Sequence, residues 1–341
     1  MTNNLRAVCA IALMGVSPAM AVIIKDSTVQ AAYYGIPDSP ANPFNGIATT
    51  SSGGLGCSGF AISSTTVLTA GHCVSGPVSV TFWIVNPNTM TFGANTFVAD
   101  SALVNPKFDA ANLVNGYDVA LLTFNTPLPN AVMTYPLYQS DIGLGSNFEL
   151  FGRGSCGSPL TGFAGCSDGN SLHRAMNRYD VELNQSGASV LIYDFVNDYS
   201  IRSSASGTDC PSTSALCFIE HHDFGSKDVG PNALLGKQGI SIYGDSGGPS
   251  LIFNLATSRY EAVGLHSFIG CVNQPCANPP DVHPTFNPDG SFGEYAGDTS
   301  LYSLRYFVAT GSNVPEPAAW ISAACGLAWL GVARRKKQLA S

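Results

Sequence analysis

The sequence has few charged side chains. Of its 341 residues, 15 are basic and 23 are acidic, so only 11% are charged and the net charge is −8. A chain that coats nucleic acid carries clusters of positive charge, and a disordered chain has few apolar residues, whereas 45% of these residues are apolar. The composition therefore excludes both classes, and it indicates a folded protein that does not bind nucleic acid.

Long amphipathic helical patterns and internal repeats are also missing. The chain has 36 glycines and 21 prolines, and these residues separate short runs rich in β-branched and aromatic side chains. This pattern predicts an all-β antiparallel sandwich or barrel. The expected strands are 66–69, 78–85, 96–104, 119–124, 147–151, 190–196, 250–254 and 262–267. One closing helix is expected over 301–310, with Asp298, Thr299 or Ser300 as its cap.

The beginning of the chain is typical of export. Arg6 precedes an apolar run, Ala7 to Val16, and small residues follow in Ser17 to Ala21. A positive charge, a short apolar stretch and a small-residue exit are the three parts of a secretory signal peptide. We therefore expect residues 1–21 to be removed, so that the mature chain begins at Val22.

The end of the chain carries a second ordered pattern. Val314-Pro315-Glu316-Pro317 precedes the uncharged stretch 318–333, which is followed by Arg334-Arg335-Lys336-Lys337. As a helix, this stretch would be about 24 Å long, slightly shorter than a bilayer core of ~30 Å. The basic cluster would hold its end at the cytoplasmic face of the membrane.

This terminal pattern resembles the PEP-CTERM sorting signal of Gram-negative bacteria. The resemblance implies that an exosortase recognises and cuts residues 314–341, with transient membrane contact through residues 318–333. A plain membrane anchor is the alternative. In either case we expect the domain of residues 22–313 to be exported, to the cell surface or the extracellular space.

The ten cysteines also fit export. Two of them, Cys9 and Cys325, lie in the terminal segments, which leaves eight in the domain. An even number in an exported protein predicts disulfides between near neighbours. The predicted pairs are Cys57–Cys73, Cys156–Cys166, Cys210–Cys217 and Cys271–Cys276. No Cys-x-x-Cys spacing supports a zinc site, and adjacent His221 and His222 point in different directions, so we expect no metal and no cofactor.

Three segments carry residue types used in acyl transfer. These are Thr69-Ala70-Gly71-His72-Cys73, Tyr117-Asp118-Val119-Ala120-Leu121-Leu122 and Gly244-Asp245-Ser246-Gly247-Gly248-Pro249. Each alone fits ordinary turn or strand chemistry. Together they supply a hydroxyl nucleophile, an imidazole to take its proton and a carboxylate to orient the imidazole.

At this point the sequence resembles the chymotrypsin-like serine proteases of the trypsin family (S1). Cys57-Ser58-Gly59 stands 15 residues before His72, and Cys73 follows the histidine directly, as in the family's histidine-loop disulfide. Gly152-Arg153-Gly154 is similar to the family's Gly-Trp-Gly, and Ser267-Phe268 to its Ser-Trp. The resemblance covers roughly Val22 to Thr310.

The resemblance implies two six-stranded antiparallel β-barrels with the active site at their interface, a short C-terminal helix and disulfide-pinned loops. It also implies that Ser246 is the nucleophile, His72 the general base and Asp118 its orienting carboxylate. The N–H groups of Gly244 and Ser246 would form the oxyanion hole. Ser267 would hydrogen-bond to Asp118, and Asp245 would pair with the new amino terminus at Val22.

The expected substrate pocket departs from the trypsin pattern. Ile240 stands where trypsin has an aspartate, and Ile242 replaces a disulfide cysteine, so the resemblance does not imply cleavage after Arg or Lys. Ser241 and His266 resemble the pair that accepts acidic side chains in glutamyl endopeptidases. Together with Ser267 and Phe268, these residues predict a pocket for an acidic or an apolar P1 side chain.

We therefore expect an exported serine endopeptidase that hydrolyses protein or peptide substrates through an acyl-enzyme. Two other functions compete with this one. The Gly-x-Ser-x-Gly pattern around Ser246 also fits an α/β-hydrolase esterase, although Gly247-Gly248-Pro249 opposes the helix which that fold needs. The other alternative is a catalytically silent surface module that uses a protease fold for binding.

Overall fold

The computed structural model describes residues 22–24, 35–154, 157, 162, 171–185, 187–195, 237–271 and 294–311. The expected signal peptide and sorting signal lie outside these residues. So do members of three expected disulfides, those of Cys156, Cys210 and Cys276. In the described part of the chain, no helix is long and apolar enough to cross a membrane.

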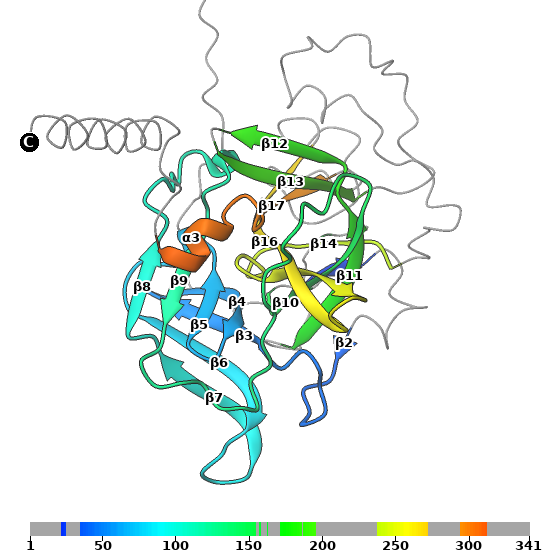
Figure 1. Ribbon diagram of the computed structural model, residues 1–341. Helices are drawn as coiled ribbons and strands as arrows, with labels where there is room; N and C mark the ends of the chain where they lie inside the picture. Colours follow the sequence, from blue (N-terminus) through cyan, green and yellow to red (C-terminus); the bar gives the residue numbers. More distant parts are fainter. Residues whose placement is uncertain are drawn as a thin grey trace, which may run out of the picture.

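The first half of the chain forms a seven-stranded antiparallel sheet in the order β7-β6-β3-β4-β5-β9-β8 (Figure 1). Its strands are β3 (Ile47–Ser52), β4 (Leu55–Ser63), β5 (Thr66–Thr69), β6 (Val78–Val85), β7 (Phe92–Val98), β8 (Ser101–Val104) and β9 (Ala120–Thr123). Strand β6 alternates strictly between buried and partly buried residues, which gives the sheet one apolar face. Val80, Phe82 and Ile84 fill the core on that face.

This sheet closes on itself to form a barrel. Strands β7 and β8 lie at its two edges, yet only Ala99 and Asp100 separate them in the chain. The N–H of Ala99 donates to Val78 of β6, and the N–H of Asp100 donates to Thr123 of β9. Because two residues join the two edges, the edges must meet.

The second half forms an eight-stranded antiparallel sheet in the order β12-β13-β17-β16-β15-β10-β11-β2. Its strands are β2 (Gly35–Ile36), β10 (Asn147–Gly152), β11 (Leu172–Arg178), β12 (Val181–Gln185), β13 (Ala188–Phe195), β15 (Pro249–Asn254), β16 (Arg259–Cys271) and β17 (Glu294–Ser300). Inside it, Phe148 and Tyr179 stack with ring centroids 4.0 Å apart, and Tyr193 meets Phe148 edge-on. A separate two-stranded ladder pairs β1 (Ile23–Ile24) with β14 (Gly239–Ile240).

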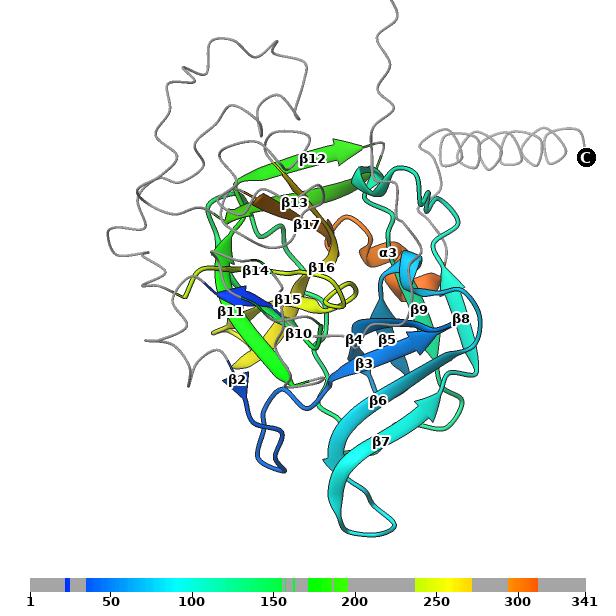
Figure 2. The same ribbon diagram turned by 180° about the vertical axis from the view of Figure 1, so that it is seen from behind.

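A third apolar cluster joins the two halves. Phe44 and Phe151 contact each other with ring centroids 4.5 Å apart, and Phe60, Leu251 and Phe307 belong to the same cluster. Phe307 is the buried residue of the short helix α3 (Arg305–Thr310) that follows β17. The molecule is thus a chymotrypsin-like double β-barrel, as expected, with its two halves packed side by side (Figures 1 and 2).

Three details differ from the sequence predictions. The sheets hold seven and eight strands rather than six each, in part because β2 adds a two-residue edge strand. The predicted strand 96–104 is divided at residues 99–100, where the chain crosses from β6 to β9. The helix begins at Arg305 instead of Leu301, since the expected caps Asp298, Thr299 and Ser300 pair with β16 as part of β17.

Candidate active site

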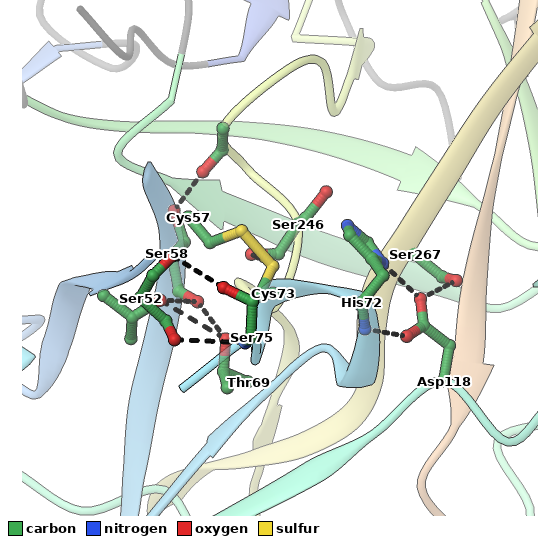
Figure 3. Close-up of a disulfide and its surroundings, with 12 residues drawn as sticks. Ser52, Cys57, Ser58, Thr69, His72, Cys73, Ser75, Asp118, Ser246 and Ser267 are labelled. Carbon is green, nitrogen blue, oxygen red and sulfur yellow. Dashed lines mark hydrogen bonds and ion pairs between the residues drawn. A yellow bond between two sulfur atoms is a disulfide. The ribbon is translucent and has the colours of Figure 1, made fainter. Parts of the chain in front are cut away.

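Each barrel contributes to one cluster of polar side chains. His72 lies in the 3-10 turn η1 (Gly71–Cys73) directly after β5, and Asp118 lies two residues before β9. Ser246 lies in the turn that follows β14 and precedes β15. Figure 3 shows the side chains of Ser246, His72 and Asp118 near the Cys57–Cys73 disulfide, with His72 between the other two.

The carboxylate of Asp118 is fully buried and holds His72 at two points. His72 Nδ1 lies 2.7 Å from Asp118 Oδ2, and the His72 N–H donates to Asp118 Oδ1 at 2.9 Å. Ser267 Oγ donates to Oδ2 at 2.5 Å, as the sequence predicts, and Thr299 Oγ1 donates to the Asp118 carbonyl. These bonds fix the plane of the imidazole and direct its Nε2 away from the carboxylate.

Charge and burial act in opposite directions on this pair. Burial alone would lower the pKa of His72, but the charge and hydrogen bond of Asp118 outweigh it, so the pKa is raised above 6.5. Burial alone would raise the pKa of Asp118, but the His72 charge and the bonds from His72 and Ser267 lower it. The imidazole is therefore a stronger base than a free histidine, beside a carboxylate that stays ionised.

The loop around Ser246 has a backbone that only glycine adopts readily. Gly244 has φ of 88° and Gly247 has φ of 82°. A Cβ on Gly247 would also lie 2.4 Å from Thr69 Oγ1 and 2.5 Å from the Ser58 carbonyl oxygen. The glycines thus let this loop turn sharply against the first barrel.

Among the residues that the structure describes, two N–H groups of this loop have no acceptor. Within the described ranges, the N–H groups of Gly244 and Ser246 donate no hydrogen bond, whereas those of residues 245, 247 and 248 all donate to backbone carbonyls. The Ser246 carbonyl accepts the N–H of Ser58 at 2.9 Å. A pair of free amides beside a hydroxyl can bind a developing oxyanion.

The carboxylate of Asp245 holds the loop of Ser246 in place through hydrogen bonds to the backbone. Its carboxylate is fully buried and accepts three backbone N–H groups, from Val22 at 2.8 Å, Ile242 at 2.9 Å and Gly154 at 3.0 Å. Burial raises the pKa of Asp245 to about 6 despite these bonds. The structure therefore brings Val22 and Asp245 together, 223 residues apart in the chain.

The expected pocket residues come from β14, from the residue after it and from β16, and each contacts a different group. Ile240 is fully buried, and Phe268 is partly buried against Tyr295. Ser241 Oγ lies 2.8 Å from the hydroxyl of Tyr193. His266 is buried, with Nδ1 2.8 Å from Asp298 Oδ1.

Asp298 is the site-proximal residue that the sequence analysis missed. It pairs with His266, and its other oxygen accepts hydroxyl hydrogens from Tyr179 and Ser250, both at 2.6 Å. From the sequence, Asp298 was one of three candidate caps for the closing helix, with Thr299 and Ser300. The signal in the sequence was an acidic residue close to small and apolar residues, because an acid that is buried in a strand needs partners from other strands.

The expected disulfide Cys57–Cys73 is present and joins β4 to η1. Cys57, His72 and Cys73 are grouped closely enough to resemble a metal site. Both sulfurs are bonded to each other, so neither is a thiolate that could ligate a metal. The group therefore stabilises the histidine turn instead of holding an ion.

With this geometry established, the chain can be compared with known proteins. The family model of trypsin matches residues 36–161. This match supports a serine protease of the chymotrypsin type, and it includes His72, Asp118 and the disulfide but ends before Ser246. Among curated proteins, none matches the chain significantly.

The raised pKa of His72 predicts a specific pH dependence. The imidazole must be neutral to accept a proton, so we expect kcat/KM to rise with pH through a midpoint above 6.5. Asp118→Asn removes the charge that raises the pKa while leaving the burial that lowers it. The midpoint should therefore move to lower pH, and the maximal rate should fall.

A pH profile and an NMR titration of His72 measure this shift. Asp100→Asn is the matched control, because Asp100 is exposed and its carboxylate accepts the N–H of Asn125, away from His72 and Ser246 in the chain. An unchanged midpoint in Asp118→Asn would show that Asp118 does not set the basicity of His72.

Proposed function

We propose that this protein is an exported serine endopeptidase that hydrolyses peptide bonds through an acyl-enzyme intermediate. The observation that supports it best is the coincidence of three arrangements at one place. These are the His72–Asp118 pair, the Ser246 hydroxyl and the two free amides of Gly244 and Ser246. An α/β-hydrolase esterase is not supported, since the described chain is a double β-barrel.

In the proposed reaction, Ser246 Oγ attacks the carbonyl carbon of the scissile bond while His72 Nε2 takes the hydroxyl proton. The carbonyl oxygen becomes an oxyanion that accepts the N–H groups of Gly244 and Ser246. His72 then gives the proton to the leaving amine, and the C–N bond breaks. A water molecule, deprotonated by the same imidazole, attacks the acyl-enzyme and releases the acid and Ser246.

During these steps, Asp118 orients His72 and stabilises its protonated form. Because its carboxylate is ionised and bonded to Nδ1, the histidine carries its neutral-state proton on Nδ1 and leaves Nε2 free to accept. The bond from Ser267 gives the buried carboxylate an additional donor. The pair therefore stabilises the positive charge that appears when Nε2 is protonated.

We further propose that the P1 side chain is acidic or apolar and not Arg or Lys. Ile240 at the expected pocket base belongs to an apolar cluster with Ile242, so neither of these two residues offers a counter-charge to a buried P1 cation. His266 offers the acidic alternative. Its Nε2 is buried, and Asp298 raises the pKa of His266 although burial opposes this.

Activation by export is also part of the proposal. In the chain as it stands, Val22 has φ of 22°, a region that β-branched residues rarely adopt. A free amino terminus has no φ torsion, so cleavage after Ala21 would release this strain. The same cleavage would place a positive α-amino group on Asp245 Oδ2 and strengthen the bond that anchors the loop.

The first test concerns the nucleophile. Ser246→Ala should lower peptide turnover by about a thousandfold or more, because the variant lacks the hydroxyl that forms the acyl-enzyme. A fluorophosphonate probe should label the wild-type chain at Ser246 and leave the variant unlabelled. A folded wild-type protein without turnover and without labelling would instead indicate a silent binding module.

The second test concerns the P1 side chain. Among peptides that differ only at P1, those with Glu, Asp, Leu or Phe should be cleaved at least about tenfold faster, by kcat/KM, than those with Arg or Lys. His266→Leu should lower the rate for Glu and Asp more than the rate for Leu. A preference for Arg or Lys would overturn this part of the proposal.

The third test concerns the two chain ends. Mass spectrometry of active protein recovered from the producing cells should find Val22 at the amino terminus and no peptide that contains Arg334 to Lys337. An active protein that begins beyond Ile36 would contradict activation at Val22. Recovery of the basic tail on mature protein would contradict the proposed exosortase processing and favour a plain anchor.

A further inference from the structure

Ser58 is a fully buried residue of β4 whose polar groups are all engaged. Its N–H donates to the Ser246 carbonyl at 2.9 Å, and its own carbonyl accepts the hydroxyl of Thr69 at 2.8 Å. Its hydroxyl donates to the Gly244 carbonyl at 2.9 Å and accepts the Arg153 N–H at 3.0 Å. One side chain of the first barrel thereby bonds to two separate segments of the second.

The bond to Gly244 bears directly on the proposed oxyanion hole. Gly244 has φ of 88° and no side chain, so little in the residue itself restricts rotation of its peptide groups. Its N–H must face the substrate, and its carbonyl points instead at Ser58 Oγ. The carbonyl and the N–H of Gly244 lie in two neighbouring peptide planes that are joined at its Cα. The bond from Ser58 holds the carbonyl plane and with it the Gly244 Cα, so the N–H plane keeps fewer ways to turn from the substrate.

The other partner of the Ser58 hydroxyl is itself held firmly. The buried guanidinium of Arg153 binds both carboxylate oxygens of Asp38, at 2.7 and 3.2 Å, and donates to the Ile47 carbonyl at 2.8 Å. It also lies 4.1 Å from the centroid of the Trp83 ring. The Arg153 N–H is therefore a fixed donor, and it orients the Ser58 hydroxyl so that its hydrogen points at Gly244.

We propose that Ser58 is a positioning residue for the oxyanion hole, which it holds open through its hydroxyl bond to the Gly244 carbonyl. The inference rests on the proposed protease function and adds a residue that touches neither substrate nor reacting atoms. Hydrogen bonds link Asp38, which lies between β2 and β3, to Arg153 after β10, then to Ser58 in β4, and finally to the carbonyl of Gly244.

Replacement of Ser58 by Ala is the first experiment. It leaves the Gly244 carbonyl without its donor, so we expect kcat to fall by about ten- to a hundredfold while KM changes little. The affinity for a peptide boronic acid, whose tetrahedral adduct places an oxygen in the hole, should fall by a similar factor. The pH midpoint assigned to His72 should stay where it is.

Ser52→Ala is the matched control. Ser52 is also a buried serine of the first barrel, and its hydroxyl likewise donates to a backbone carbonyl, of Gly76, and accepts a backbone N–H, of Ser75. It should lose thermal stability without a change in kcat or in boronate affinity. If Ser58→Ala behaves like Ser52→Ala, the positioning role is wrong.

Two variants of nearly equal shape distinguish loss of the hydroxyl bond from misfolding. Thr and Val have nearly the same shape: Ser58→Thr adds a methyl group and keeps the hydroxyl, whereas Ser58→Val also replaces the hydroxyl by a methyl group. We expect Thr to retain most of the activity and boronate affinity that Val loses, and equal values in the two variants would overturn the inference.

Ser246→Ala separates the proposed protease function from the role of Ser58. A loss of turnover in Ser246→Ala together with full activity in Ser58→Ala refutes only the role of Ser58.

Discussion

The buried carboxylate of Asp245 is the interaction on which the arrangement of the site depends. An ionised carboxylate inside a protein costs several kcal/mol unless donors surround it. Here the donors come from three distant segments, at Val22, Gly154 and Ile242. Satisfying this one group therefore fixes the amino-terminal ladder, the end of β10 and the loop of Ser246 relative to one another. Any change that removes a donor leaves the charge exposed to an apolar interior, and the loop must move to hydrate it.

The site belongs to neither barrel alone. His72 and Asp118 come from the first, yet Asp118 is bonded by Ser267 and Thr299 of the second. Ser246 comes from the second, yet its carbonyl is held by Ser58 of the first. The apolar cluster that includes Phe44 and Phe151 packs the two halves against each other. Packing between the barrels thus sets the distances among the polar groups, and the polar groups in turn align the barrels.

The sequence predicts features that depend on neighbouring residues in the chain, and it predicts few of the contacts between distant segments. Strand β6 was predicted within its observed bounds because alternating apolar residues report directly on a buried face. The segments of His72, Asp118 and Ser246 could be recognised because each carries its turn chemistry within a few residues. Asp298 and Ser58 could not be assigned their partners, since the groups they bond come from other strands. The break at residues 99–100 was missed for the same reason, because only the neighbouring strands decide where β7 ends.

The contact between Val22 and Asp245 has a consequence for the timing of activity. It closes a loop of 223 residues, and contacts of such long range form late because the intervening chain must be ordered first. A partly synthesised or partly folded chain could therefore hold His72 and Asp118 in place without any organised loop for Ser246. The proposed protease would then become competent only as its folding is completed.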